Sequence, residues 1–153
     1  MTETMQKKTT AEVLTAVYKN VKMASDSILD LMPKVKDEKL KSDMTVQLSV
    51  LEAFASRTAK LLALEGVKPE EEGVLAKLSA KWGTMMSTMR DGSPEHIAEL
   101  MIEGATMGVN DMMRVLREAE NTTVSEDALR LTRDVCEFED KMVRDMREYL
   151  KER

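Results

Sequence analysis

The chain contains few of the residues that strands and tight turns require. Aromatic residues make up 3% of its 153 residues, and it has six glycines and three prolines. Aromatic residues favour β-strands, whereas glycine and proline interrupt helices, so a low content of both favours long helices. The remainder is rich in leucine, methionine, alanine, glutamate and lysine, which are good helix formers. We therefore predict a single all-α domain over residues 1–153, with residues 1–9 as a loose tail.

Cysteine, long apolar runs and excess positive charge are also lacking. Cys136 is the only cysteine, which excludes an intramolecular disulfide and gives no indication of an oxidising compartment. No stretch approaches the length of a membrane span, which is about 18 apolar residues, and the initial MTETMQKKTTAEV lacks the apolar core of a signal peptide. The net charge of −5 comes without a basic stripe, so neither nucleic acid nor a membrane is an expected partner. These absences predict a soluble cytoplasmic protein.

Apolar residues that recur at alternating three- and four-residue steps predict five helices. The predicted helices cover residues 11–32, 37–65, 70–90, 94–119 and 124–150. Thr9 with Glu12, and Thr123 with Glu126, have the spacing of a capping box, which marks the starts of the first and last helices.

The lengths of these helices predict how they are connected. The first, second, fourth and fifth are each about 22–29 residues, or about 33–43 Å at 1.5 Å per residue. Short links join the first helix to the second and the fourth to the fifth, which predicts two antiparallel hairpins. Residues 66–93 lie between the hairpins and hold the shorter predicted helix. This segment is long enough to travel from one end of a four-helix bundle to the other.

The apolar stripes identify the residues that we expect to face the core. They are Leu14, Val17, Val21, Ile28 and Leu31 in the first helix, Leu40, Met44, Leu48, Leu51, Ala55, Thr58 and Leu62 in the second, Ile97, Met101, Gly104, Gly108, Met112 and Val115 in the fourth, and Ala128, Leu131, Val135, Phe138, Met142, Met146 and Tyr149 in the last. Glu139 falls inside the last stripe. A buried carboxylate is costly unless it is hydrogen-bonded, paired or protonated. Gln47 and Thr58, on the inward arc of the second helix, are its candidate partners if they lie at the same height.

Two antiparallel hairpins joined by a full-length crossover resemble the ferritin-like superfamily. The chain is most similar to the short bacterial members, in which a stretch such as HIAELMIEGATMG, residues 96–108, is expected. The resemblance covers nearly the whole chain in helix order. It implies a four-helix bundle whose crossover contains a shorter fifth helix. It also implies a di-iron site made by a Glu from each of two helices and Glu-x-x-His from each of the other two.

The ligands that this resemblance implies are incomplete in the sequence. Matched to the pattern, Glu52 is followed by Ala55 and Glu139 by Met142, so apolar residues occupy both histidine positions. The only histidine, His96, is in the first turn of its predicted helix. A standard six-ligand site therefore cannot be assembled within one chain, and no cofactor is predicted. A non-standard divalent metal site formed by Glu139, Glu52 and Asp111 is the open alternative.

The 14 methionines and a glycine pair each have two interpretations. Methionine can ligate Cu(I), but most of these residues fall on inward stripes, which favours core packing. Met86 and Met113 lie off the stripes, where they predict a surface for a partner or a dimer. Gly104 and Gly108 predict close approach of a neighbouring helix, with space for a ligand as the alternative.

No residue pattern supports nucleophilic catalysis, and there is no glycine-rich phosphate loop. We therefore expect a non-catalytic bundle that binds a protein partner or forms a homodimer through its helix faces. The alternative is a metal-binding or redox-active ferritin relative with a reduced site around Glu139 and Glu52.

Overall fold

The computed structural model describes residues 8–69 and 92–151 of the chain. In these ranges the elements are helical: α1 (Thr10–Leu31), the 3-10 turn η2 (Met32–Lys34), α2 (Glu38–Leu64), α4 (Pro94–Glu118), α5 (Glu126–Arg147) and the 3-10 turn η3 (Glu148–Leu150). The prediction of an all-α fold is confirmed for this part of the chain. The helix predicted over residues 70–90 lies outside the described residues. None of the described helices is long and apolar enough to cross a membrane.

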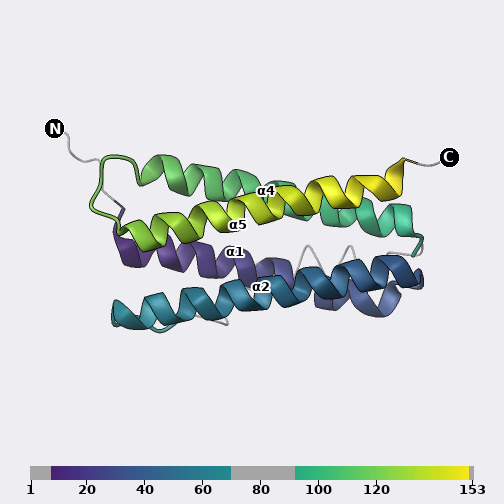
Figure 1. The fold of residues 1–153 in the computed structure, drawn as a ribbon, viewed down its shortest axis with the longest axis horizontal. Helices are drawn as coiled ribbons and strands as arrows, with labels where there is room; N and C mark the ends of the chain where they lie inside the picture. Colours follow the sequence, from purple (N-terminus) through teal and green to yellow (C-terminus); the bar gives the residue numbers. More distant parts are fainter. Residues whose placement is uncertain (1–7, 70–91, 152–153) are drawn as a thin grey trace.

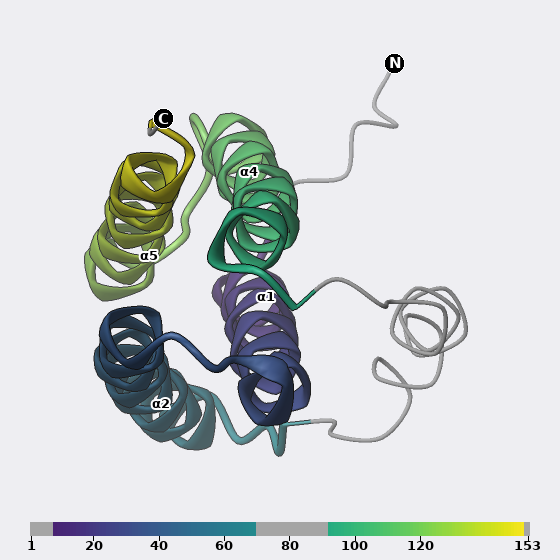
Figure 2. The ribbon, with the colours of Figure 1, turned by 90° about the vertical axis from the view of Figure 1, so that its right-hand side faces the viewer.

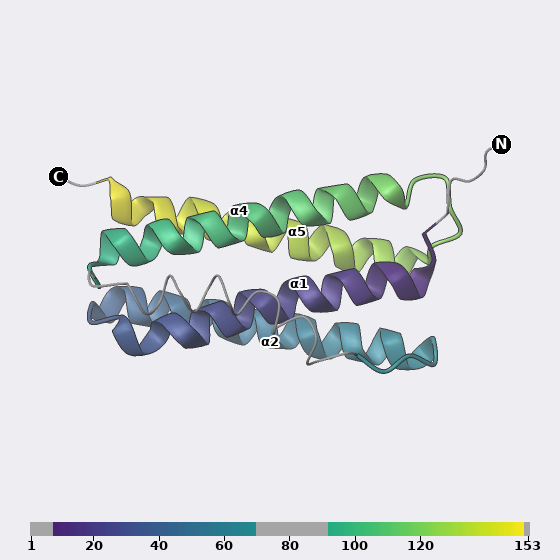
Figure 3. The same ribbon diagram turned by 180° about the vertical axis from the view of Figure 1, so that it is seen from behind.

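The four long helices form a bundle of two hairpins, α1–α2 and α4–α5 (Figure 1). Viewed end-on, α4 lies above α1 and α5 lies above α2 (Figure 2). Two contacts show that α1 and α4 are antiparallel: Lys8 Nζ lies 3.2 Å from Glu118 Oε1, and Asn20 Nδ2 lies 3.1 Å from the Gly108 carbonyl oxygen. The view from behind shows these two helices side by side (Figure 3).

The second hairpin packs on α2 through contacts spread along the bundle. The Arg57 guanidinium lies 2.9 Å from the Asp134 carboxylate, and Lys39 Nζ lies 3.4 Å from the Tyr149 hydroxyl. Because residue numbers rise along α2 as they fall along α5, these helices are antiparallel. Since α2 ends and α4 begins at opposite ends of the bundle, α2 and α4 run in the same direction (Figure 1).

Residues whose side chains cap the backbone N–H groups mark the starts of the helices. The predicted capping box at Thr9 and Glu12 is confirmed, with both backbone-to-side-chain bonds present at 3.0–3.1 Å. The box predicted at Thr123 is wrong, because Ser125 is the N-cap and accepts a hydrogen bond from the Ala128 N–H. The Ser125 N–H donates to the Thr10 hydroxyl across the bundle end, which keeps this residue outside the helix.

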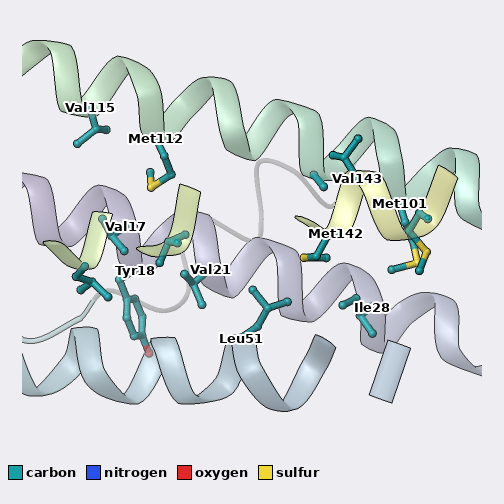
Figure 4. Packing of buried hydrophobic residues seen from close by; sticks show 14 of the residues in the cluster. Val17, Tyr18, Val21, Ile28, Leu51, Met101, Met112, Val115, Met142 and Val143 are labelled. Atoms are coloured by element: carbon teal, nitrogen blue, oxygen red, sulfur yellow. The ribbon is translucent and has the colours of Figure 1, made fainter. Parts of the chain in front are cut away.

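The core follows the predicted stripes closely (Figure 4). All five predicted inward residues of α1 are buried, and so are most of those on the other helices. Leu48, Ala55, Phe138 and Tyr149 are half-buried, and Gly104 is exposed. The methionines of the stripes fill this core, including Met142 and Met146. Each fully buried side chain of this size contributes about 1.5–3 kcal/mol of transfer free energy.

Candidate functional site

Glu139 is the one acidic side chain of the described residues that is buried in the bundle core, with 1% of its surface exposed. It lies on the inward stripe of α5 between Val135 and Met142, both of which are buried. The sequence prediction of an inward carboxyl is therefore confirmed. Its position is near mid-length of the bundle.

The partner of this carboxyl is Asn20 of α1, which is 5% exposed. The Asn20 carboxamide hydrogen-bonds the Glu139 side chain, and its Nδ2 also donates to the Gly108 carbonyl oxygen at 3.1 Å. Three helices therefore meet at one polar contact, which we call the Glu139 node: Glu139, Asn20 and the backbone of Gly108.

The predicted partners on α2 do not serve Glu139. The Thr58 hydroxyl donates to the Phe54 carbonyl oxygen of its own helix at 2.7 Å. The Phe54 ring lies 5.8 Å from the Phe138 ring, so Phe54 marks the level of Glu139 on α2. Gln47 lies seven residues earlier, or about 10 Å along the helix axis, and its Oε1 has no hydrogen-bond partner among the described residues. The assignment of partners to α2 was wrong.

Gly108 makes room for the node. A Cβ atom at this position would lie 2.4 Å from Glu139 Oε1 and 3.3 Å from Asn20 Nδ2. Gly104 is different, because it is exposed and a Cβ atom there would have no atom within 4 Å. The prediction that both glycines face inward is wrong for Gly104. At Gly108 the close neighbours are the Glu139 side chain of α5 and the Asn20 side chain of α1, not the backbone of another helix.

Burial raises the pKa of the Glu139 carboxyl to about 8, against an ordinary value of 4.5. The nearby negative charge of Asp111 raises this pKa further, while the hydrogen bond from Asn20 lowers it. At neutral pH the side chain is therefore mainly a neutral acid. Burial also raises the pKa of the Cys136 thiol one turn away, with Glu139 as the next contribution, so this thiol is not an activated nucleophile.

Two oxygens of the node, Glu139 Oε1 and Asn20 Oδ1, have no hydrogen-bond partner among the described residues. Because Asn20 Nδ2 donates to the Gly108 carbonyl, the orientation of the carboxamide is fixed and its Oδ1 can only accept. A protonated carboxyl carries the donor that such an acceptor requires. The chemistry that this arrangement supports is hydrogen bonding by a neutral acid.

The other predicted metal ligands occupy different surroundings. Glu52 is exposed on α2, and Asp111 is half-buried on α4, where its carboxylate pairs with the Arg114 guanidinium. His96 lies at the start of α4 with its Nδ1 3.6 Å from Glu99. Within residues 8–69 and 92–151, no three His, Cys, Asp or Glu side chains form a group that could hold a metal ion. The metal site at Glu139, Glu52 and Asp111 stays a prediction.

Asn20 and Gly108 are less evident from the sequence than Glu139. Asn20 lies on the flank of the apolar stripe of α1, and Gly108 lies on the inward face of α4. Both are near mid-length of their helices, as Glu139 is, and this shared height is the feature of the sequence that could place them beside Glu139.

Comparison of the chain with protein-family models, curated proteins and solved structures finds no match. Over the described residues, the fold and the site define an all-α bundle whose core holds one buried acid, Glu139.

Proposed function

We propose that the chain is a ferritin-like bundle with a degenerate metal site, and that it acts by binding a protein partner or a second copy of itself, not by catalysis. The observation that carries this proposal is the Glu139 node. An amide side chain and a glycine carbonyl close around the central carboxyl, and neither group is a general acid or base.

The protonation of Glu139 supports the same conclusion. A carboxyl with a pKa of about 8 is mainly neutral at pH 7 and acts as a hydrogen-bonding group of the core. Glu139 alone cannot provide the paired acid and base of most hydrolytic mechanisms. Its hydrogen bond with α1 contributes to specific packing of the two hairpins.

The outer surface supports a binding role. Val46, Leu64, Met107 and Met113 are large apolar side chains that are exposed on α2 and α4. Met113 is one of the two methionines predicted to lie off the core stripe, and Met86, the other, lies outside the described residues. Flexible methionine side chains adapt to varied partner surfaces.

Iron oxidation tests the non-catalytic proposal. Purified protein is mixed with Fe(II) in aerated buffer, and the appearance of Fe(III) is compared with buffer alone. We expect equal rates. A rate well above that of buffer, and lost in Glu139→Ala, would contradict the proposal.

The competing function is a metal-binding or redox-active bundle, and one observation favours it. The Asp111 charge acts on Glu139, whose Oε1 lacks a partner among the described residues, so two acidic groups are near each other. Elemental analysis of protein grown with Fe, Mn, Zn and Cu separates the two functions. We expect less than one metal per chain, whereas one metal per chain that disappears in Glu139→Ala would establish the competitor.

A further inference from the structure

The outward side of α5 carries a shallow hollow of about 350 Å³. The side chains that line it are Asp134, Glu137, Phe138, Lys141 and Arg144. The four charged residues recur at three- and four-residue steps, so they share one face of the helix, opposite the buried stripe that contains Glu139. In Figure 1 this helix lies in front, and no other described element covers it.

The charges along this face change sign at its centre. Asp134 and Glu137 precede the level of Glu139, and Lys141 and Arg144 follow it. The pattern continues outward: five pairs of residues at equal distances on either side of position 139 carry opposite charges, whereas Asp140 and Arg147 have the apolar Phe138 and Leu131 as counterparts. These opposed pairs are Glu137 and Lys141, Asp134 and Arg144, Arg133 and Asp145, Arg130 and Glu148, and Asp127 and Lys151.

When two copies of such a helix face each other in antiparallel orientation, each of these charges lies opposite a charge of the other sign. In a dimer with two-fold symmetry, the same surface of both copies forms the interface, and a residue of one copy meets a different residue of the other. If the two-fold axis passes through the outer face of α5 at the level of Glu139, the two α5 helices are antiparallel. Each Glu137 then faces Lys141 of the partner subunit, and each Asp134 faces Arg144 of the partner subunit.

From this complementarity we propose that the outer face of α5 is the interface of a homodimer. The inference rests on the proposed binding function and adds the outer face of α5 as a surface for it, with a second copy of this chain as the partner. Electrostatic complementarity of this type selects the orientation of the partner and speeds association.

The charges of this face also have partners within the chain, and these partners do not prevent the dimer. Asp134 pairs with Arg57 at 2.9 Å, Lys141 pairs with Asp145 at 2.7 Å, and Arg144 pairs with Asp140. The side chains of these three pairs are between 41% and 61% exposed, and exposed pairs contribute little, so they exchange partners at small cost. Glu137 makes no ion pair within the described residues. Phe138, packed on Phe54, provides the apolar part of the surface.

Light scattering or sedimentation of the whole chain tests the interface. We expect a dimer at low salt that weakens as salt is raised, because its central contacts are exposed charges. Glu137→Lys places two lysines opposite each other at both symmetric positions, and Lys141→Glu does the same with two glutamates. Each single variant should raise the dimer dissociation constant about tenfold or more.

The charge-swap variant Glu137→Lys/Lys141→Glu restores opposite charges and should recover the dimer. An equimolar mixture of the two single variants should also dimerise, although neither does so alone, because each then meets the opposite charge. Glu103→Lys, an equal charge change at an exposed position of α4, is the matched control and should leave the dimer unchanged. Circular dichroism checks that each variant is folded.

Two results would overturn the inference: a chain that is monomeric at low salt and high concentration, or a dimer that Glu137→Lys and Lys141→Glu leave unchanged. If the protein is a dimer that these two variants leave unchanged, the proposed binding function would still hold, but the dimer interface would lie on another surface. Iron oxidation that depends on Glu139 would remove the proposed function without affecting the α5 interface, so the two failures are distinguishable.

Discussion

Glu139 shows how one buried acid can be accommodated by few neighbours. An ionised carboxylate buried to this degree would cost several kcal/mol unless it were fully compensated. The titratable neighbour Asp111 on α4 does not compensate it, because the Asp111 charge acts against the negative charge of Glu139. The Asn20 carboxamide is neutral, and its hydrogen bond lowers the pKa of Glu139 by less than burial raises it. The neutral form is therefore the one that this core fits.

The pH dependence of stability follows from this protonation. The folded-state pKa of about 8 is higher than the ordinary value of 4.5 expected for the unfolded chain. The stabilisation due to the proton is thus complete below pH 4.5, is lost as the pH rises from 4.5 to 8, and changes no further above 8. The loss is at most about 1.4 kcal/mol per pH unit.

Glu139→Gln isolates this contribution, because the amide keeps the shape of the protonated acid and cannot ionise. Urea unfolding of both proteins from pH 5 to pH 9 measures the difference between their free energies of unfolding. We expect the natural protein to lose stability relative to Glu139→Gln as pH rises to about 8, with a constant difference beyond that. Parallel curves throughout the range would show that Glu139 is already ionised at pH 5.

Gly108→Ala tests the packing of the node. The added Cβ would lie 2.4 Å from Glu139 Oε1, and the buried carboxyl has little space into which to move. Overpacking of this kind costs about 1–3 kcal/mol, partly offset by the helix propensity of alanine. Gly104→Ala is the matched control on the same helix, because a Cβ there meets nothing.

Thermal and urea unfolding measure both alanine variants. Gly104→Ala should stabilise the protein by up to about 1 kcal/mol, since alanine is the better helix former. Gly108→Ala should be less stable than Gly104→Ala by at least about 1 kcal/mol. Equal stabilities would mean that Glu139 lies elsewhere in solution.

At the scale of elements, the sequence predicts what depends on local chemistry. The stripes of α1 and α5 identified the buried residues because burial on a helix follows its 3.6-residue period. Asn20 was not recognised as the partner of Glu139 for a different reason. The residue of α1 that reaches the level of Glu139 depends on how the two hairpins dock, which no local pattern records.

The start of α5 shows the same limit within one loop. Thr123 and Ser125 are both acceptable N-caps by residue type, and the capping-box spacing favoured Thr123. In the structure Ser125 is the N-cap, and its N–H donates to the Thr10 hydroxyl at the start of α1 at 3.0 Å. The helix therefore starts two residues later than the sequence pattern predicts, at a residue that also contacts α1.

Alanine substitution of the two candidate caps measures this selection. Ser125→Ala removes the side-chain acceptor of the Ala128 N–H and should cost about 1 kcal/mol of folding free energy. Thr123→Ala removes an exposed side chain that makes no cap and should be nearly neutral. Chemical denaturation compares the two variants, and a larger loss at Thr123 would place the helix start where the sequence pattern put it.

At the scale of the whole molecule, the Glu139 node joins the two hairpins at mid-length. Ion pairs between the hairpins, such as Lys8 with Glu118 and Arg57 with Asp134, lie on the surface, where such pairs contribute little. Apolar packing and the node are therefore the main connections between the hairpins. A single shared core of this size should unfold in one cooperative transition.

Asn20→Ala tests this cooperativity. It removes the donor to the Gly108 carbonyl and leaves Glu139 without its amide partner, at a cost of about 1–3 kcal/mol. Because all four helices share one core, the most protected amides of every helix should lose protection by the same factor, about 5- to 150-fold. Hydrogen exchange read by mass spectrometry resolves the helices, and Asn110→Ala, the same change at an exposed position of α4, should leave protection unchanged. If only α1 and α2 lost protection, the hairpins would be independent folding units and the node would not couple them.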